Sequence, residues 1–421
     1  MYRKKAIALG AVAVLGLGMG LAGCSSSSGS SASGGTVDLT VWTGFTGGDR
    51  PGYAQIVKDF NASQKKIHVT MTVQPWDTIQ QKLPSAWLTG TGPDIAAPSS
   101  DPNVIAQYVK TNSVLPITDT GSGNSKINTS DFASALTKEF TYNGKLYAVP
   151  ANYATLSLYY NKKLFKAAGI ASAPTTVAEF QQDAKKLTTG GTYGLSLADN
   201  NTIQMWPVLQ WLSGGDIVNS KNCSVVQTAA GIKSLQPWVD LVKNDKISPV
   251  GQSGAVADSL FSAGKAAMEI NGPWAAPGYK SAGIDLGIAK LPVSVTGQAT
   301  TLGSTAPLAI SAKTKHPAEA QQFLAYYTSK AAQLKFSETT GFPPLRTDLS
   351  DNATLKANPT VSVFASQVPD ARLYLPQVPS ATQVDANGYV PLIQKVTRDG
   401  DVAGDTKAAA ATINSLTGCK S

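Results

Sequence analysis

The stretch VDLTVWTGFTGGDRPGYAQIVKDFNASQKKIHVTMTV, from Val37 to Val73, decides the predicted fold. Apolar and polar residues alternate over Val37–Val41 and again over Ile67–Val73, which predicts two strands. Between them the apolar residues from Tyr53 to Phe60 recur at helical spacing, and Trp76–Leu88 predicts a second helix despite an internal proline. This β-α-β-α order predicts an α/β fold with mainly parallel sheets.

Later segments continue the same pattern. The runs Leu146–Val149 and Leu156–Tyr160 indicate two more strands. Thr176 and Glu179 have the spacing of a capping box, which predicts that a helix begins there. A further helix is expected after His316, over apolar positions that end near residue 327.

The N-terminus has the organisation of an export signal. Positive residues 3–5 precede an apolar run, Ala6–Gly23, and small residues then lead to Cys24. An uncleaved anchor helix is the alternative, but 18 residues with five glycines are marginal for spanning a bilayer. The Ser/Gly-rich segment 25–35 is typical of a flexible tether. We therefore expect a signal peptide over 1–23, a tether over 24–35 and ordered sequence from Thr36.

The Leu21–Cys24 sequence, LAGC, resembles the lipobox of bacterial lipoproteins. That resemblance implies cleavage before Cys24 and a diacylated thiol. It also implies that the mature protein is lipid-anchored at the extracellular face of the bacterial cell membrane.

Composition restricts the possible partners. Residues 36–421 suffice for two domains with a large core. The formal net charge is +8, and removal of the three positive residues at 3–5 with the signal leaves +5. The remaining Lys and Arg residues are scattered, which argues against nucleic acid as a partner. No second apolar segment reaches membrane-spanning length. The two histidines, His68 and His316, indicate neither a metal cluster nor a catalytic triad, and we expect no cofactor.

Two cysteines remain after Cys24. Cys223 and Cys419 are an even pair in an exported chain, so a disulfide between them is our interpretation. Two separate thiols are the alternative, because sequence does not give the distance between them.

Several segments together resemble one family. They occur in a specific order: Val41–Gly44, Gly92–Ile95, Asn143–Pro150, Leu158–Phe165, Phe261–Met268, Asn271–Trp274 and Gly341–Pro344. This set is similar to the extracellular solute-binding proteins of carbohydrate ABC transporters, the maltose-binding-protein type. The resemblance covers essentially residues 36–421.

The resemblance implies a monomer of two lobes, with a sugar in the cleft between them and permease subunits as partners. Domain closure on the ligand is the shape change that a transporter would recognise. Lobe one is expected to contain 36–152 and 305–343, and lobe two 155–302 and 346–421. The chain would cross between lobes near 152–155, 302–305 and 343–346.

A sugar site needs aromatic faces for C–H groups and polar side chains for hydroxyls. Local sequence pattern supplies the first group of candidate ligand-binding residues. Each of them follows a predicted strand or lies in an apolar segment that could face either a ligand or the core. They are Trp42, Thr43, Phe45, Arg50, Trp76 and Trp206. For Trp42, Trp76 and Trp206 a core position is the alternative.

Other candidates come from the resemblance. Trp274 matches a tryptophan that stacks on sugar in relatives, and a core position is the alternative for it. Asp101 lies where relatives place a carboxylate. The aromatic and arginine expected beside Asp101 are prolines here, which indicates a different sugar. The first crossing between lobes supplies the candidates Asn152 and Tyr153, at a place where relatives often have an acidic residue. The third crossing supplies Arg346. Tyr389 lies where relatives offer a C-terminal aromatic.

Enzyme functions have little support in the sequence. Ser262-Ala-Gly-Lys265 fits the S-x-x-K pattern of penicillin-interacting enzymes, but a K-T-G motif is absent. A glycosidase would need a carboxylate pair, which no motif marks. We predict a non-enzymatic sugar-binding lipoprotein of an ABC importer. The alternatives are a surface-tethered carbohydrate hydrolase and a binding protein for a non-sugar solute.

Overall fold

The structure is a computed structural model that describes residues 35–99, 101, 103–118, 126–200, 205–376, 378 and 380–419. The predicted signal peptide, Cys24 and most of the predicted tether lie outside the described residues. The chain divides into a unit of residues 1–35 and a unit of residues 36–421.

A five-stranded sheet forms the centre of the first lobe, in the order β2-β1-β3-β13-β6. β1 (Val37–Thr43) runs parallel to β2 (Ile67–Val73) and β3 (Ile95–Ala96). β13 (Pro307–Ile310) is antiparallel to β3 and to β6 (Val149–Pro150). The two strands predicted at the start of the chain are therefore confirmed, with Val37 opposite Ile67 in register.

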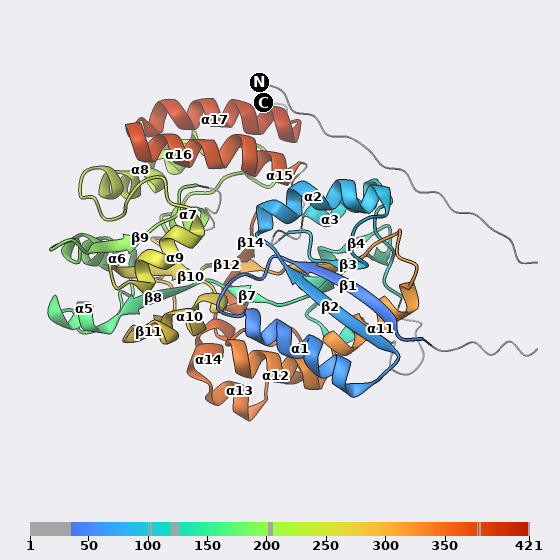
Figure 1. The fold of residues 1–421 in the computed structure, drawn as a ribbon. Helices are drawn as coiled ribbons and strands as arrows, with labels where there is room; N and C mark the ends of the chain where they lie inside the picture. The colour runs from blue at the N-terminus through green and yellow to red at the C-terminus, as the bar shows by residue number, and fades with distance from the viewer. Residues whose placement is uncertain are drawn as a thin grey trace, which may run out of the picture. The chain divides into compact units, whose positions relative to one another are not determined.

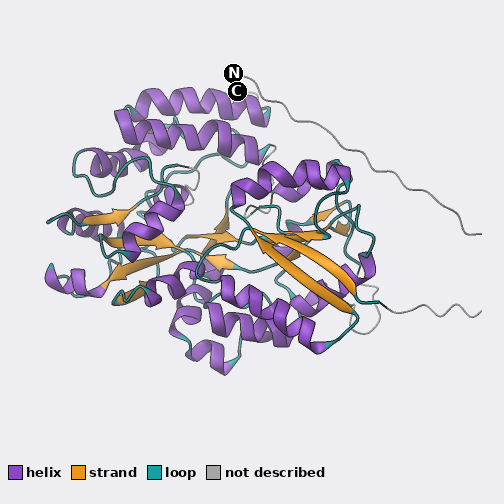
Figure 2. Ribbon diagram, in the orientation of Figure 1, coloured by secondary structure: helices purple, strands orange, loops and turns teal. Residues whose placement is uncertain are grey.

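Helices flank this sheet (Figures 1 and 2). They are α1 (Arg50–Ser63), α2 (Trp76–Thr89), α3 (Val104–Lys110), α4 (Ser134–Lys138), α11 (Pro317–Tyr327) and α12 (Lys330–Thr340). Alternation along β1 buries Leu39 and Val41, and the helical spacing buries Phe60 of α1 in the same cluster. β4 (Thr141–Tyr142) and β5 (Lys145–Leu146) form a separate hairpin.

A four-stranded sheet forms the centre of the second lobe, in the order β11-β8-β10-β9. Its strands are β8 (Ser157–Asn161), β9 (Tyr193–Ser196), β10 (Ala266–Asn271) and β11 (Leu286–Ala289). β9 is parallel to β10, whereas β8 is antiparallel to both β10 and β11.

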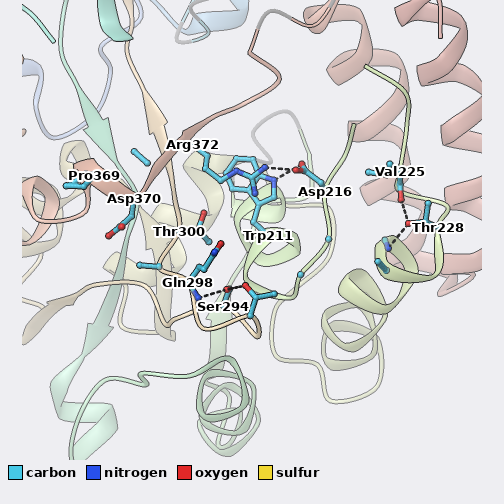
Figure 3. Close-up of a pocket in the computed structure, with 17 residues that line it drawn as sticks. Trp211, Asp216, Val225, Thr228, Ser294, Gln298, Thr300, Pro369, Asp370 and Arg372 are labelled. Atoms are coloured by element: carbon cyan, nitrogen blue, oxygen red, sulfur yellow. Dashed lines mark hydrogen bonds and ion pairs between the residues drawn. The ribbon is translucent and has the colours of Figure 1, made fainter. Parts of the chain in front are cut away.

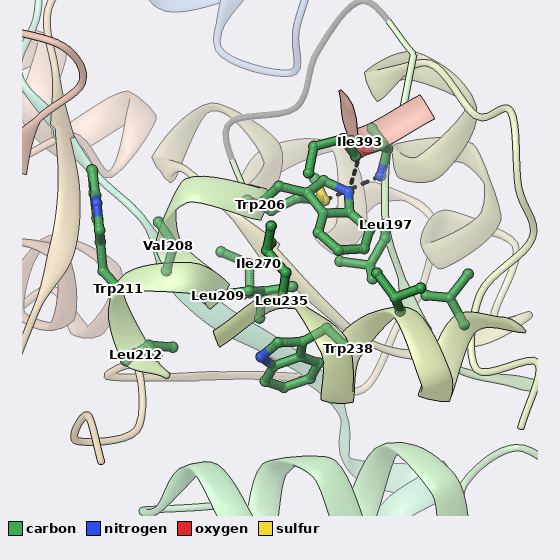
Figure 4. Packing of buried hydrophobic residues seen from close by; sticks show 14 of the residues in the cluster. Leu197, Trp206, Val208, Leu209, Trp211, Leu212, Leu235, Trp238, Ile270 and Ile393 are labelled. Atoms are coloured by element: carbon green, nitrogen blue, oxygen red, sulfur yellow. Dashed lines mark hydrogen bonds between the residues drawn. The ribbon is translucent and has the colours of Figure 1, made fainter. Parts of the chain in front are cut away.

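The surrounding helices build a large apolar cluster (Figure 4). They are α5 (Lys162–Ala167), α6 (Val177–Lys186), α7 (Met205–Leu212), α8 (Ala229–Lys243), α9 (Gly254–Ser262), α15 (Ala381–Val384), α16 (Val390–Asp399) and α17 (Val402–Thr417). Trp206 and Trp238 are fully buried there. The helix α10 (Ala276–Ser281) packs in a smaller cluster with Tyr159 and Phe261. The predicted capping box of Thr176 and Glu179 is present at the start of α6.

A third, three-stranded sheet connects the two lobes, and we call it the crossing sheet. β12 (Thr301–Ser304) runs parallel to β14 (Ala371–Leu373) and antiparallel to β7 (Ala154–Thr155). The chain passes from β6 through β7 into β8, and it returns from β12 directly into β13. α13 (Ala353–Ala357) and α14 (Pro359–Ala365) lie between α12 and β14 along the chain.

Strand pairing is more mixed than the sequence predicts. Parallel neighbours require a crossover element between them, usually a helix. β8 and β13 instead enter their sheets directly from the crossing strands, and each pairs antiparallel with its neighbours. The expectation of mainly parallel sheets holds for β1, β2 and β3 but not for the second lobe.

Two features of the described residues bear on function. No helix among them is both long and apolar enough to span a bilayer. They also contain no grouping of His, Cys, Asp and Glu side chains that could hold a metal ion.

Candidate functional site

A cavity of about 450 Å³ lies between the two lobes, and we call it the central cavity. The first lobe contributes the loop 44–49 after β1 and the start of α2. The second lobe contributes the start of α9 and the segment 270–274 at the end of β10. Residues of the crossing strands, among them Ala154 and Ser304, complete the lining. Loops that follow the carboxyl ends of sheet strands are where open α/β folds bind ligands.

The two tryptophans that line this cavity, Trp76 and Trp274, each lie over a glycine. A Cβ atom added to Gly44 would come within 2.0 Å of the Trp76 ring, and one added to Gly272 within 2.1 Å of the Trp274 ring. Only glycine therefore leaves room for either ring. Trp76 and Trp274 are both half-buried, so part of each indole faces the cavity.

Other aromatic rings hold these tryptophans in place. Phe45 meets Trp76 edge to face, with ring centroids 5.5 Å apart, and it stacks on Tyr53 at 3.8 Å. The buried Phe342 lies 6.3 Å from Trp274. Aromatic faces of this kind suit the C–H faces of a sugar ring.

Three carboxyl groups line the cavity: Asp49, Asp77 and Asp258. Asp49 is 4% exposed and occupies the N-cap position of α1, yet its side chain makes no capping bond and its Oδ1 has no hydrogen-bond partner. Burial raises the pKa of Asp49 to about 7, although hydrogen bonds from its own backbone and from Tyr53 oppose the shift.

Asp258, on α9, is hydrogen-bonded by two neighbouring side chains. Asn271 donates from Nδ2 to Asp258 Oδ1 at 2.8 Å, and the Tyr279 hydroxyl lies 3.4 Å from the same oxygen. Burial raises the pKa of Asp258, while hydrogen bonds from Glu269, Asn271 and Tyr279 oppose that shift. Asp77 is exposed at the first turn of α2.

Four of the predicted ligand residues line the central cavity: Phe45, Trp76, Asn152 and Trp274. Asn152 also ties the crossing strands together. It donates from Nδ2 to the Tyr53 hydroxyl at 2.6 Å and accepts from the Ala306 backbone N–H at 3.1 Å. Little of its side chain is free for a ligand.

Two predicted residues lie in the apolar core instead. Trp206 is 0% exposed, and its Nε1 donates to the Ala198 carbonyl at 3.0 Å. Tyr389 is 0% exposed, and its hydroxyl donates to Gln210 Oε1 at 2.7 Å. Both polar groups are thus satisfied inside the second lobe, which corrects the sequence-based assignment of these residues.

Arg346 is occupied by protein groups in the first lobe. Its Nη2 lies 2.7 Å from Asp131 Oδ2, its Nε lies 2.9 Å from Asp348 Oδ1, and its Nη1 donates to the Thr328 carbonyl at 3.0 Å. All of these partners lie away from the central cavity. The expectation that Arg346 contacts ligand is therefore wrong for this arrangement.

The remaining predicted residues do not line the central cavity either. Trp42 packs half-buried against the cluster around α2 and α3, Thr43 is buried, and Arg50 is exposed at the start of α1. Tyr153 is half-buried against the first-lobe core. Asp101 accepts hydrogen bonds from the backbone N–H and the side chain of Asn103, both at 2.9 Å, just before α3.

Sequence reasoning missed several lining residues. Asn271 and Phe342 line the cavity and lie inside two of the motifs that carry the family resemblance. The sequence therefore marked their segments, but not these two residues as ligand contacts. Asp49 and Asp258 carry no local signal, because an aspartate before or within a helix is usually a cap or a solvated group. Only the approach of the two lobes brings them to one cavity.

A second hollow of about 880 Å³ lies in the second lobe, beside β14 (Figure 3). There the Arg372 guanidinium lies over the Trp211 ring, 4.5 Å from its centroid, and pairs with Asp216. Trp211 Nε1 also donates to Asp216 Oδ1 at 2.9 Å. The Trp211 ring, Arg372 and Asp216 thus already interact with one another, so we take the central cavity as the candidate ligand site.

The chain belongs to the bacterial extracellular solute-binding protein family, whose model matches residues 55–363. The multiple sugar-binding protein of Streptococcus mutans is 29% identical over 305 residues, covering 69% of this chain and 70% of that protein.

Solved structures share the two-lobe fold. The GacH receptor of Streptomyces glaucescens, solved unliganded and with acarbose, superposes with a TM-score of 0.80 at 24% identity, covering 92% of this chain and 100% of that one. The MalE domain of Bdellovibrio bacteriovorus, bound to maltotriose, has a TM-score of 0.78 at 24% identity, covering 90% and 99%.

Proposed function

We propose that this protein captures a sugar or oligosaccharide in the central cavity and delivers it to the permease of an ABC importer. The observation that carries the proposal is the lining of that cavity. Two half-buried tryptophans, one from each lobe, face the same space as carboxylate and amide groups. A saccharide offers apolar ring faces and hydroxyls in the same combination. The sugar-binding relatives support this choice of ligand class.

The crossing sheet would serve as the hinge. Its strands are short, and β7 continues into each lobe within a few residues. We propose lobe boundaries close to 152–155 and 302–305. The third crossing would lie beyond Arg346, since that residue pairs with first-lobe Asp131. Ligand contact with both lobes would favour the closed arrangement, and a permease could recognise that arrangement.

The mature protein would be tethered by lipid on Cys24 at the extracellular face of the membrane. The support is the LAGC sequence after an export signal, followed by a Ser/Gly-rich segment. The family match to extracellular proteins agrees with this location.

Thermal-shift and calorimetric screens against mono- and oligosaccharides test the proposed function. We expect at least one saccharide to raise the melting temperature and to bind with one-to-one stoichiometry. No response to any saccharide would contradict the proposal.

A hydrolase is the competing function, because two cavity carboxyls, Asp49 and Asp258, have raised pKa values, as catalytic acids often do. Chromatography after long incubation separates the two functions. We expect the bound saccharide to be recovered intact. Cleaved product that disappears in the Asp258→Asn variant would establish the hydrolase instead.

A further inference from the structure

The charges around the central cavity are all of one sign. Its described lining includes Asp49, Asp77 and Asp258 but no Lys, Arg or His side chain. The residues between 36 and 419 that the structure does not describe also include no Lys, Arg or His. Any solute that enters therefore meets acidic groups without a protein cation to balance them.

One carboxyl oxygen of Asp49, a residue that lines the cavity, has no hydrogen-bond partner among the described residues. The side chain is almost fully buried, and this oxygen is Oδ1. A buried carboxylate oxygen without a donor is costly, because it has lost its water and gained nothing in return. A ligand that supplies a charged N–H donor would compensate this loss most fully.

A second acid, Glu269, is buried next to Asp258. Glu269 is 0% exposed, its Oε2 accepts a hydrogen bond from the Tyr279 hydroxyl, and it also hydrogen-bonds Asp258. Burial, and then the charge of Asp258, raises the pKa of Glu269 well above its usual range. Burial therefore disfavours the charge of Glu269 more strongly than that of Asp258, which is only partly buried and lines the cavity.

The aromatic walls favour the same kind of ligand. The faces of Trp76 and Trp274 carry negative electrostatic potential, so they attract a cation as well as an apolar ring face. A neutral saccharide would use the rings and hydrogen-bond the carboxyl groups. An ammonium group would in addition stabilise the ionised form of Asp49, which burial disfavours. A phosphorylated or carboxylated solute would be repelled.

We propose that the ligand of the central cavity is a saccharide that carries an ammonium group, held by Asp49 and Asp258. This inference rests on the proposed saccharide-binding function and narrows its substrate class. The ammonium group would bond to one or both of these carboxyl groups, and the sugar ring would pack on Trp274.

Calorimetric titration with matched probes tests the proposal. The probes are maltose, cellobiose and lactose, each as the parent sugar, as its 6-amino-6-deoxy derivative and as the N-acetylated form of that derivative. Spermidine provides the amine without a sugar. For at least one scaffold we expect the amine to bind roughly tenfold or more tightly than both neutral forms, which is about 1.4 kcal/mol.

The variants Asp49→Asn and Asp258→Asn should each reduce that preference to near parity. Asp370→Asn is the matched control, because Asp370 lines the second hollow instead. It should leave the preference unchanged. If all three variants lost the preference for the amine equally, the amine-binding site could not be assigned to the central cavity.

The other outcomes separate this inference from the function on which it rests. Neutral forms that bind as well as the amine would overturn the inference and leave saccharide binding intact. Binding of spermidine with no response to any saccharide would overturn the proposed saccharide function and the ligand class built on it. No binding to any probe would count against both.

Discussion

Trp274 and Trp238 show how one residue type takes two roles in this chain. Trp274 is half-buried at the central cavity, whereas Trp238 is 0% exposed and its Nε1 donates to Ser213 Oγ at 2.9 Å. Truncation should therefore affect different properties at the two positions. A contact with ligand is lost in one case and core packing in the other.

We expect Trp274→Ala to weaken saccharide binding by about 1–3 kcal/mol, through lost stacking and apolar area, and to change the melting temperature little. Trp238→Ala, the matched control, should instead lower stability by about 3–5 kcal/mol. Calorimetry and thermal melts on both variants provide the measurement. A large stability loss with unchanged affinity in Trp274→Ala would remove that residue from the site.

Asp49 gives a pH dependence with a defined sign. Its pKa is about 7 in the folded protein against an ordinary value of 3.8, so folding disfavours its charged form. Below about pH 4 the carboxyl is protonated in both states. Between pH 4 and 7 the unfolded chain has lost the proton and the folded chain still holds it, so this residue's contribution to stability falls as pH rises.

Replacing Asp49 by Asn removes this titration. The unfolding free energy of the variant minus that of the parent should increase from pH 4 to pH 8, on the order of 2–4 kcal/mol. Urea unfolding of both proteins across that range is the measurement, and groups that titrate equally in both cancel in the difference. A difference that stays constant with pH would show that Asp49 titrates normally.

The sequence could predict which kinds of side chain line the site, but it could not predict reliably which particular residues do so. Trp206 and Trp274 both lie in apolar segments, and nothing local separates them. Trp206 is buried because helices from distant parts of the chain cover it, whereas Gly272 leaves the Trp274 ring at the cavity. Asp49 and Asp258 meet only through the tertiary fold, so no motif marks them.

At the scale of elements, local periodicity predicted the first β-α-β unit and the capped start of α6, because those features depend on neighbouring residues. Pairing direction in the second lobe could not be predicted in this way. It depends on where the crossing strands enter the sheet, and those strands are two to four residues long.

The C-terminal helix α17 is fastened to the loop before α8 in two ways. Cys223 and Cys419 form a disulfide with Cα atoms 5.1 Å apart, in agreement with the pairing favoured from sequence. In addition, Asn414 Oδ1 accepts the Ser224 backbone N–H at 2.7 Å. The hydrogen bond should keep this helix in place when the disulfide is removed.

We expect the Cys223→Ser, Cys419→Ser double variant to fold and to lose about 2–5 kcal/mol of stability, because the bridge closes a loop of 196 residues in the unfolded chain. Urea unfolding with and without reductant measures this. The parent should fall to the level of the variant on reduction, and the variant should not respond. Identical midpoints for the oxidised parent and the variant would contradict a stabilising role.

At the scale of the whole molecule, the proposed lipid tether and ligand binding should be separable. Cys24→Ala should release the protein from membranes into the soluble fraction, since lipid would supply the anchorage. Saccharide affinity should not change, because the cavity is built from residues 44–342. Membrane fractionation tests the expected release, and calorimetry tests the unchanged affinity. A variant that still sediments with membranes would contradict the lipid anchor.

A crystal structure of the protein with the tightest saccharide of the probe set tests the central claim most directly. We predict that the sugar occupies the central cavity, with a ring face against Trp274 and polar atoms within hydrogen-bonding distance of Asp49 or Asp258. A sugar bound at the Trp211–Arg372 hollow, with the central cavity uncontacted, would contradict the account.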